Sequence, residues 1–297
     1  MVAYGQGMRL VTFWDDGMVR TGVVVGEEIV DLTAPEVGLP GDMVQLLALG
    51  PEGSARVAGA VRTRAARVPL VGARVLAPVP KPPSFLAIAK NYDAHVQELG
   101  HERPQHQMWF AKQPTCVIGP GAAIEVPRVS DDVDYEGELG IVIGTRARHV
   151  AAADWMGVVA GFVVVNDVSV RDWQWRSPTM MLGKGFDTHG PIGPWIVTPD
   201  EIGGVEHLSV RTWVNDELRQ DGNTAEMIFS CAEMVEHLST AFTLEPGMIL
   251  STGTPAGVAA GQEHPRWLRD GDVVRIEVEG VGVLSNPVVD EPAAPSR

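Results

Sequence analysis

Residues 132–144 read DVDYEGELGIVIG. Alternate residues of a β-strand share one face, so Asp132, Asp134, Glu136 and Glu138 would line up, with no lysine or arginine between them. Like charges on one face repel, which favours a solvated edge unless a cation neutralises them. The apolar run that follows predicts a buried strand, so the acidic end leads directly into the core.

A second apolar run, residues 161–165, also predicts a buried strand, and it ends on Asn166-Asp167. The carboxylate at that strand end could meet Glu136 and Glu138. Three hard oxygen ligands suit Mg²⁺ or Mn²⁺, which keep water molecules that a substrate can displace. The pattern alone leaves two interpretations open: a solvated acidic edge, and a site for one divalent metal ion.

Short apolar segments bounded by Gly, Pro or Asp dominate the chain, so we expect a mixed α+β, β-dominated fold. The strand-length segments are 85–89, 122–127, 136–144, 157–167, 191–198, 208–216, 247–257 and 272–280. Residues 8–32 predict an antiparallel meander, 43–49 and 52–67 carry helical spacing, and 77–83 is a stiff, proline-rich connector. The expected division is a small β-rich N-terminal domain at 1–76, a linker at 77–83, a catalytic domain at 84–290 and a flexible tail at 291–297.

Two helices are expected in the larger domain. Residues 151–157 form the shorter one. Ser230 and Glu233 match a capping box, which predicts an amphipathic helix beginning there. The side chains expected on its inner face are Met234, Val235, Leu238 and Phe242.

Charge and composition exclude several classes of partner. The chain has 23 Lys and Arg against 38 Asp and Glu, and the net charge of -15 repels phosphate backbones and anionic lipid. We therefore expect neither nucleic acid nor membrane as a partner, and an anionic substrate would need the local positive charge of a bound cation. Cys116 and Cys231 lack CxxC spacing, and no signal pattern or apolar run of about 20 residues occurs, which predicts a cytoplasmic protein.

His95 and Glu98 lie three residues apart, which places them on one face of a helical turn. A carboxylate in that position can orient an imidazole that acts as a general base. An isolated pair of this kind is more often an exposed pair without a function. His101 and His106 follow in a polar stretch, where solvated loop histidines are the favoured interpretation over a gate.

Four further residues are candidates for binding a substrate. Arg171 and Gln174 follow Asp167 at offsets that place them on the same side of a helical turn, although a plain surface helix explains them too. Lys184 lies between glycines in an apolar segment, where it is either a desolvated proton donor or a snorkelling surface lysine. Thr254 lies in a Gly- and Pro-containing turn of the kind that can hold a carboxylate ligand, or simply joins two strands.

Six motifs occur in order, and together they resemble the fumarylacetoacetate hydrolase family from about Phe85 to Pro287. They are NYDAHVQE, DYEGELGIVIG, GFVVVNDVSVRDWQ, LGKGFDTHGPIGPWIVT, NTAEMIFS and ILSTGTPAGV. The resemblance implies a mixed β-sandwich roll and a homodimer formed through the large domain. The family's fourth ligand, an aspartate in the founding hydrolase, is Ile88 here, and Asp187 replaces a glycine, so the founding enzyme's pocket is not carried over.

The resemblance also implies roles for individual residues. Glu136, Glu138 and Asp167 would bind Mg²⁺ or Mn²⁺. His95, Glu98 and Lys184 would be catalytic, as in the smaller acylpyruvase-like members, where the segment around His95 forms a lid. Arg171, Gln174 and Thr254 would bind the substrate.

The substrate expected from the resemblance is a small keto or diketo acid whose oxygens chelate the metal, so that an enolate is stabilised. Hydrolysis of a C–C bond in an acylpyruvate is the leading hypothesis, with water activated by His95. Decarboxylation of oxaloacetate and isomerisation of an unsaturated dioate are the alternatives. A non-catalytic ligand binder is a hypothesis of a different class, and the competent residues at every site position argue against it.

Overall fold

The computed structural model describes residues 7–63 and 65–293, and two fully buried antiparallel strands lie at its centre. They are β11 (Gly137–Ile143) and β12 (Val159–Asn166). Both are nearly continuous apolar runs, the composition of strands that are covered on both faces. Gly137 pairs with Asn166 and Glu138 with Val165, so the beginning of β11 lies beside the end of β12.

The strands form one large sheet, one smaller sheet and a short two-stranded ladder. The large sheet has the order β4-β3-β2-β1-β14-β12-β11-β17-β6-β7, with β5 on β1 and β8 on β14. The smaller sheet has the order β16-β15-β18-β19-β9, and β10 pairs with β13. The bounds are β1 Arg9–Asp15, β2 Met18–Val25, β3 Glu28–Asp31, β4 Arg67–Pro69, β5 Arg74–Val75, β6 Phe85–Ala89, β7 Met108–Lys112, β8 Val117–Ile118 and β9 Ile124–Val126. The remaining bounds are β10 Val133–Asp134, β13 Ser169–Val170, β14 Gly190–Val197, β15 Ser209–Val214, β16 Glu217–Asn223, β17 Ile249–Ser251, β18 Val273–Val278 and β19 Gly282–Asp290.

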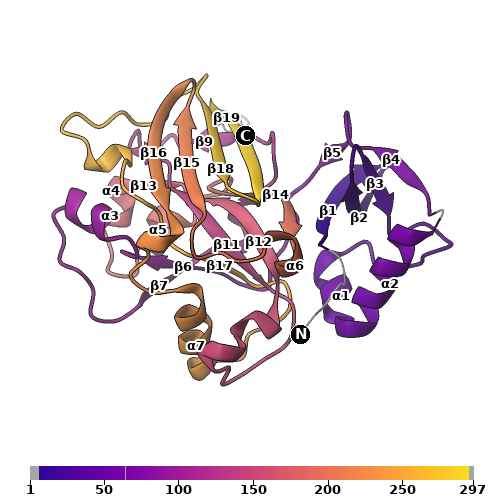
Figure 1. The fold of residues 1–297 in the computed structure, drawn as a ribbon. Coiled ribbons are helices and arrows are strands. Elements are labelled where there is room, and N and C mark those ends of the chain that lie inside the picture. Colours follow the sequence, from indigo (N-terminus) through magenta and orange to yellow (C-terminus); the bar gives the residue numbers. More distant parts are fainter. Residues whose placement is uncertain (1–6, 64, 294–297) are drawn as a thin grey trace.

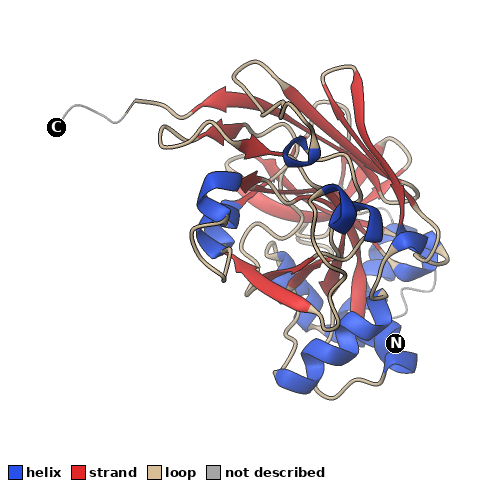
Figure 2. Cartoon of the chain, turned by 90° about the vertical axis from the view of Figure 1, so that its left-hand side faces the viewer, coloured by secondary structure: helices blue, strands red, loops and turns tan. Residues whose placement is uncertain are grey.

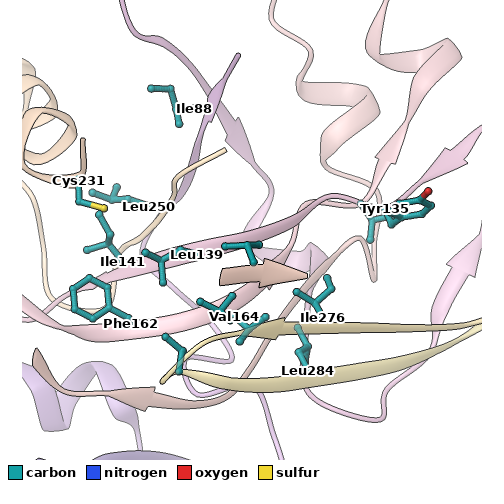
Figure 3. Packing of buried hydrophobic residues seen from close by; sticks show 14 of the residues in the cluster. Ile88, Tyr135, Leu139, Ile141, Phe162, Val164, Cys231, Leu250, Ile276 and Leu284 are labelled. Atoms are coloured by element: carbon teal, nitrogen blue, oxygen red, sulfur yellow. The ribbon is translucent and has the colours of Figure 1, made fainter. Parts of the chain in front are cut away.

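The two sheets pack face to face over one hydrophobic cluster. Leu139 and Val164 of the large sheet gather there with Ile276 and Leu284 of the smaller one (Figure 3). Burial of these side chains stabilises the fold by roughly 1.5–3 kcal/mol each. The predicted fold class, mixed α+β and strand-dominated, is confirmed.

The amino-terminal elements lie together at one side of the molecule (Figure 1). Strands β1, β2 and β3 form the predicted antiparallel meander. Strand β1 also pairs with β14, so the large sheet contains strands from before and after the connector at 77–83. The division into two domains stays a prediction.

Helices lie around the sheets (Figure 2). Their bounds are α1 Met43–Ala48, α2 Gly50–Arg62, α3 Asp93–Glu98, α4 Arg171–Gln174, α5 Met181–Lys184, α6 Pro199–Ile202 and α7 Cys231–Ala241, with 3₁₀ turns η1 Pro114–Cys116, η2 Ala152–Val158, η3 Thr224–Glu226 and η4 Ala259–Gly261. None of the helices in the described ranges has the length and apolar character needed to cross a membrane.

Three predictions about helices need correction. Helix α2 ends at Arg62 and not at Arg67, because residues 67–69 leave the helix to pair with β3 as β4. The segment predicted at 151–157 is a 3₁₀ turn. The capping box of α7 is confirmed, but Phe242 is the C-cap residue and is exposed, since the helix ends before its side chain can turn inward. Residues 1–6, part of the predicted signal-free N-terminus, and residues 294–297, part of the predicted tail, lie outside the described residues.

Strand directions bring four chain segments to one end of the large sheet. Strand β11 is antiparallel to both β12 and β17, and β17 is parallel to β6. The beginning of β11 therefore meets the ends of β12, β17 and β6. Residues that immediately precede or follow these strands are well separated in sequence and adjacent in space.

Candidate active site

Three carboxylates meet at this end of the sheet. Glu136 precedes β11, Glu138 lies at its second position, and Asp167 follows β12. Their side chains are nearly completely buried, with residue exposures of 4%, 1% and 1%. One oxygen from each lies within 4.8 Å of the others. The backbone N–H of Asp167 donates to the Glu136 carbonyl over 2.8 Å, which ties the two segments together.

The acidic run does not form one continuous solvated face. Strand β10 ends at Asp134 and β11 begins at Gly137, so the strand breaks between them. Of the four alternating carboxylates only Asp132 remains partly exposed, and Asp134 is buried away from the triad. The solvated-edge interpretation is therefore wrong for Asp134, Glu136 and Glu138, because the buried run that follows draws them into the core.

The surroundings shift the pKa values of two carboxyl groups of the triad in opposite directions. Burial, together with the charges of Asp167 and Glu136, raises the pKa of Glu138 well above its usual value. Its Oε2 accepts hydrogen bonds from the Ser251 hydroxyl at 2.5 Å and from the Gly253 N–H at 2.9 Å. Gly253 has φ of +88°, a conformation that glycine adopts without the strain of a side chain.

Glu136 titrates in the opposite direction. Burial alone would raise its pKa, but the charges of Lys184 and Arg171 outweigh burial and hold the pKa below its usual range. Glu138 thus resists ionisation, whereas Glu136 ionises readily. Three buried, hard oxygen donors that lie close together are the ligands that Mg²⁺ or Mn²⁺ prefers, so the donor set fits the predicted metal.

Lys184 reaches the triad from α5. Its Nζ lies 2.7 Å from Glu136 Oε2 and 2.9 Å from Asp167 Oδ2. Burial would lower the pKa of this ammonium, but the charges of Asp167 and Glu136 outweigh burial and raise it. Helices α4 and α5 can approach closely because residue 183 is a glycine. A Cβ at this position would lie 2.3 Å from the Gln174 backbone nitrogen.

Arg171 and Gln174 lie on the single turn of α4, as their spacing predicted. The Arg171 guanidinium contacts Asp134 through Nε at 2.8 Å and Glu136 Oε1 at 2.7 Å, and its NH1 donates to Gln174 Oε1 at 2.9 Å. The Arg171 guanidinium thus contacts three side chains of the protein, Asp134, Glu136 and Gln174. A direct role in binding the substrate stays a prediction for both residues.

His95 and Glu98 form a hydrogen-bonded pair on α3. His95 Nδ1 lies 2.7 Å from Glu98 Oε1, and Glu98 Oε2 accepts from the Gly257 N–H at 2.8 Å. Asn91 lies just before this helix, and its side chain forms hydrogen bonds with the Phe229 backbone and with the Thr252 carbonyl. The segment that resembles a lid is therefore attached to the turn following β17.

Thr254 lies in that turn, and its hydroxyl is engaged by protein atoms. It donates to the Gly137 carbonyl at 2.9 Å and accepts from Gln220 Nε2 at 2.7 Å. These bonds join the turn to the beginning of β11. The predicted contact of Thr254 with a substrate stays a prediction.

One pocket connects these residues. The space between their atoms, including its opening to solvent, is about 440 Å³. The predicted site residues that line it are His95, Glu136, Glu138, Arg171, Gln174, Lys184 and Thr254. Asp167 and Glu98 contact lining residues without lining the pocket themselves.

His101 also lines the pocket, so its interpretation as a solvated loop residue needs correction. Its ring stacks edge-on against the exposed Trp175, with 5.9 Å between the ring centroids. This contact joins the loop after α3 to a residue 74 positions further along the chain, and both rings line the pocket. His106 remains exposed, as predicted.

Two buried residues at the site have no role in the sequence-based predictions. Lys112 Nζ lies 2.6 Å from Asp167 Oδ1 and also donates to the Lys184 carbonyl. Asp134 accepts from Arg171 and from the backbone N–H groups of Ala259 and Ala260. In the sequence, Lys112 could have been identified only as a lysine at the end of an apolar strand. Asp134 could have been identified only by its place in the acidic run.

A buried carboxylate triad, a lysine and a histidine–glutamate pair around one pocket define an enzyme-like site at the end of a mixed β-sandwich. The chain belongs to the fumarylacetoacetate hydrolase family, because the family's "Fumarylacetoacetate (FAA) hydrolase C-terminal" sequence model matches residues 84–289. It is 38% identical over 292 residues to the mitochondrial oxaloacetate tautomerase Fahd2a of Rattus norvegicus, covering 96% of this chain and 92% of the relative.

Two solved structures extend the comparison. A maleylpyruvate hydrolase from Sphingobium sp. SYK-6, in complex with manganese(II) and pyruvate, is 34% identical, with a TM-score of 0.80. A 5-carboxymethyl-2-hydroxymuconate delta-isomerase from Mycobacterium smegmatis is 33% identical, with a TM-score of 0.78. In both comparisons 96% of this chain and 100% of the other chain are covered. Relatives of this chain are thus enzymes with tautomerase, isomerase or hydrolase names.

Proposed function

We propose that this protein is a divalent-metal-dependent enzyme that interconverts the keto and enol forms of a 2-oxo acid, with oxaloacetate as substrate. The observation that carries the proposal is a single pocket lined by Glu136, Glu138, Lys184 and His95. The 38% identity to an oxaloacetate tautomerase over 96% of the chain supports the choice of substrate.

The residues that would hold the metal are Glu136, Glu138 and Asp167. A bound Mg²⁺ or Mn²⁺ supplies Lewis-acid stabilisation of negative charge on the oxygens of a 2-oxo acid. The manganese in the related maleylpyruvate hydrolase structure supports this assignment.

Two groups of the chain would move the proton. If Nδ1 of His95 donates its hydrogen to Glu98, the Nε2 atom of the imidazole would be the one that acts as a base. His95 would take a proton from carbon 3 of the substrate, so that the C–H bond breaks and a C2–C3 double bond forms. The Lys184 ammonium would give a proton to the oxygen on carbon 2. The same transfers in reverse return the keto form. Proton exchange with solvent would restore the starting protonation states of His95 and Lys184.

Hydrolysis of an acylpyruvate, the leading hypothesis from the sequence, is the second candidate. It is favoured by the His95–Glu98 pair, which could activate a water molecule for attack on the distal carbonyl. The name of the maleylpyruvate hydrolase relative supports it. Decarboxylation of oxaloacetate would use the same enolate without the water.

The reaction product separates these candidates. Purified protein with Mg²⁺ or Mn²⁺ would receive enol oxaloacetate, an acylpyruvate and an unsaturated dioate, and products would be resolved by ultraviolet absorbance and mass. We expect rapid loss of the oxaloacetate enol at unchanged mass, abolished in His95→Asn. Release of an acid plus pyruvate only would favour the hydrolase, and release of carbon dioxide the decarboxylase. If the protein accelerated the reaction of none of these substrates above the metal-only blank, the hypothesis of a non-catalytic binder would remain. The predicted homodimer would be checked on the same preparation by light scattering.

A further inference from the structure

The few lysines of this acidic chain concentrate at the pocket. The sequence contains four, namely Lys81, Lys90, Lys112 and Lys184. Lys184 and Lys90 line the pocket, and Lys112 lies directly behind it against Asp167. Lys112 and Lys184 are engaged by carboxylates. Within residues 7–63 and 65–293, Lys90 forms no ion pair.

The backbone holds Lys90 in a costly conformation. Lys90 directly follows β6 and has φ of +60°, in the left-handed region. A non-glycine residue there costs about 1–2 kcal/mol, and such residues persist where the surroundings fix them, often at functional sites. The next residue, Asn91, provides that fixation through its bonds to Phe229 and to the Thr252 carbonyl.

Lys90 and His101 are neighbours in the lining of the pocket. The pKa of His101 is lowered by burial and then by the charges of Lys90 and His95. The lowered pKa favours the neutral imidazole of His101, which can donate one hydrogen bond. The carboxylates that line the pocket, Glu136 and Glu138, belong to the triad, so none of the lining residues offers Lys90 a dedicated partner.

The charges of the site balance only when Lys90 is counted. With all four ionised, as they would be around a bound cation, the buried carboxylates Asp134, Glu136, Glu138 and Asp167 equal in number the basic groups Lys90, Lys112, Arg171 and Lys184. A divalent cation then leaves this set with two positive charges, which match a dianion. Without Lys90 the set would match a monoanion. The His95–Glu98 pair adds one negative charge or none in either case, so it does not alter the difference that Lys90 makes.

We infer that Lys90 binds the second carboxylate of a dianionic 2-oxo acid and so selects dicarboxylates over monocarboxylates. This inference rests on the proposed function, because it assumes that the 2-oxo end of the substrate lies at the triad. His101, which also lines the pocket, completes a polar subsite between the end of β6 and the loop after α3. A monoanionic acylpyruvate would leave the Lys90 ammonium without a partner.

The test compares oxaloacetate with its 4-methyl ester, which lacks the charge of the distal carboxylate and carries one additional methyl group. Both ligands would be titrated into the Mn²⁺-loaded parent, Lys90→Met and Lys90→Arg by calorimetry and by thermal denaturation. Turnover of both would be measured in parallel. Lys81→Met is the matched control, because Lys81 is exposed in the proline-rich connector.

We expect Lys90→Met to lower the preference for oxaloacetate over the ester by about 10- to 100-fold, the range for loss of a hydrogen bond to a charged group. Lys90→Arg should keep most of the preference, and Lys81→Met all of it. An unchanged preference in Lys90→Met would overturn the inference, as would equal weakening of both ligands.

Failure of the inference and failure of the proposed function give different results. A parent that binds oxaloacetate through Lys90 but turns over neither ligand contradicts the enzyme proposal and keeps the subsite. A parent that turns over oxaloacetate with no dependence on Lys90 keeps the enzyme and removes the subsite. A parent that binds neither ligand overturns both.

Discussion

Replacement of Asp134 by asparagine should destabilise the protein through Arg171. The Asp134 carboxylate is fully buried and lies 2.8 Å from both Nε and NH2 of the almost fully buried guanidinium. It also accepts from the N–H groups of Ala259 and Ala260 at 2.8 and 3.0 Å. Asparagine keeps the shape but removes the charge and turns one acceptor into a donor that faces other donors.

The expected loss follows from the burial of this pair. Removing one partner of a buried ion pair costs about 3–5 kcal/mol, and the acceptor that asparagine keeps places the value near the lower end. The free energy of unfolding should fall by about 3 kcal/mol, with a decrease in Tm of about 5 °C for a chain of 297 residues. Urea denaturation with a chelator present measures this without a contribution from bound metal.

Asp221→Asn is the matched control, since Asp221 pairs with Arg211 at the same 2.8 Å on the exposed surface. Its unfolding curve should coincide with that of the parent. If Asp134→Asn lost no more stability than this control, the account of Asp134 as the support of Arg171 would be wrong.

Three further substitutions test other contacts. Glu98→Gln should lower kcat by about 100-fold with little change in KM, because His95 loses the carboxylate that orients it. Lys112→Met should weaken Mn²⁺ binding by about 10- to 100-fold, because Asp167 loses the group that fixes its Oδ1. His189→Gln should flatten the dependence of stability on pH. Burial lowers the pKa of His189 to about 4 from 6.5, so the unfolded chain binds more protons between these values and stability falls as pH decreases. The parent should lose about 2 kcal/mol more than the variant between pH 7 and 5.

Exposed residues of the same type provide the controls. Glu102→Gln, Lys81→Met and His264→Gln should behave as the parent in the corresponding assays. Equal loss of kcat in the Glu102 variant would show a general effect on the loop after α3. Unchanged or tighter Mn²⁺ binding in the Lys112 variant would remove its positioning role. Parallel pH profiles for the parent and the His189 variant would contradict neutral burial of that histidine.

The triad was predictable because its signal is local. Alternation along β11 and the polar end of β12 mark Glu136, Glu138 and Asp167, and antiparallel pairing of adjacent strands brings them together. Helical spacing likewise predicted the His95–Glu98 pair. Their roles as ligands and catalytic groups remain predictions that the experiments above address.

Residues that act through distant partners were not predictable in this way. Lys112 meets Asp167 across 55 positions, and Asp134 meets the N–H groups of η4 across 125 and 126. No spacing rule covers such pairs, since they depend on how the sheets pack. His101 was misjudged for the same reason, because its contact with Trp175 exists only in the folded chain. The end of α2 was missed because pairing with β3 outweighs helical spacing at residues 67–69.

Titration of the metal-free protein with Mn²⁺, followed by the electron paramagnetic resonance signal of the free ion, tests the central claim most directly. The account predicts one Mn²⁺ per chain for the parent and for Glu102→Gln. It predicts at least about 100-fold weaker binding for Glu138→Gln, which removes one of the three charged ligands while the fold is monitored by circular dichroism. A parent that binds no Mn²⁺, or a folded Glu138→Gln variant that binds it as tightly as the parent, would contradict the assignment of Glu136, Glu138 and Asp167 as the metal site.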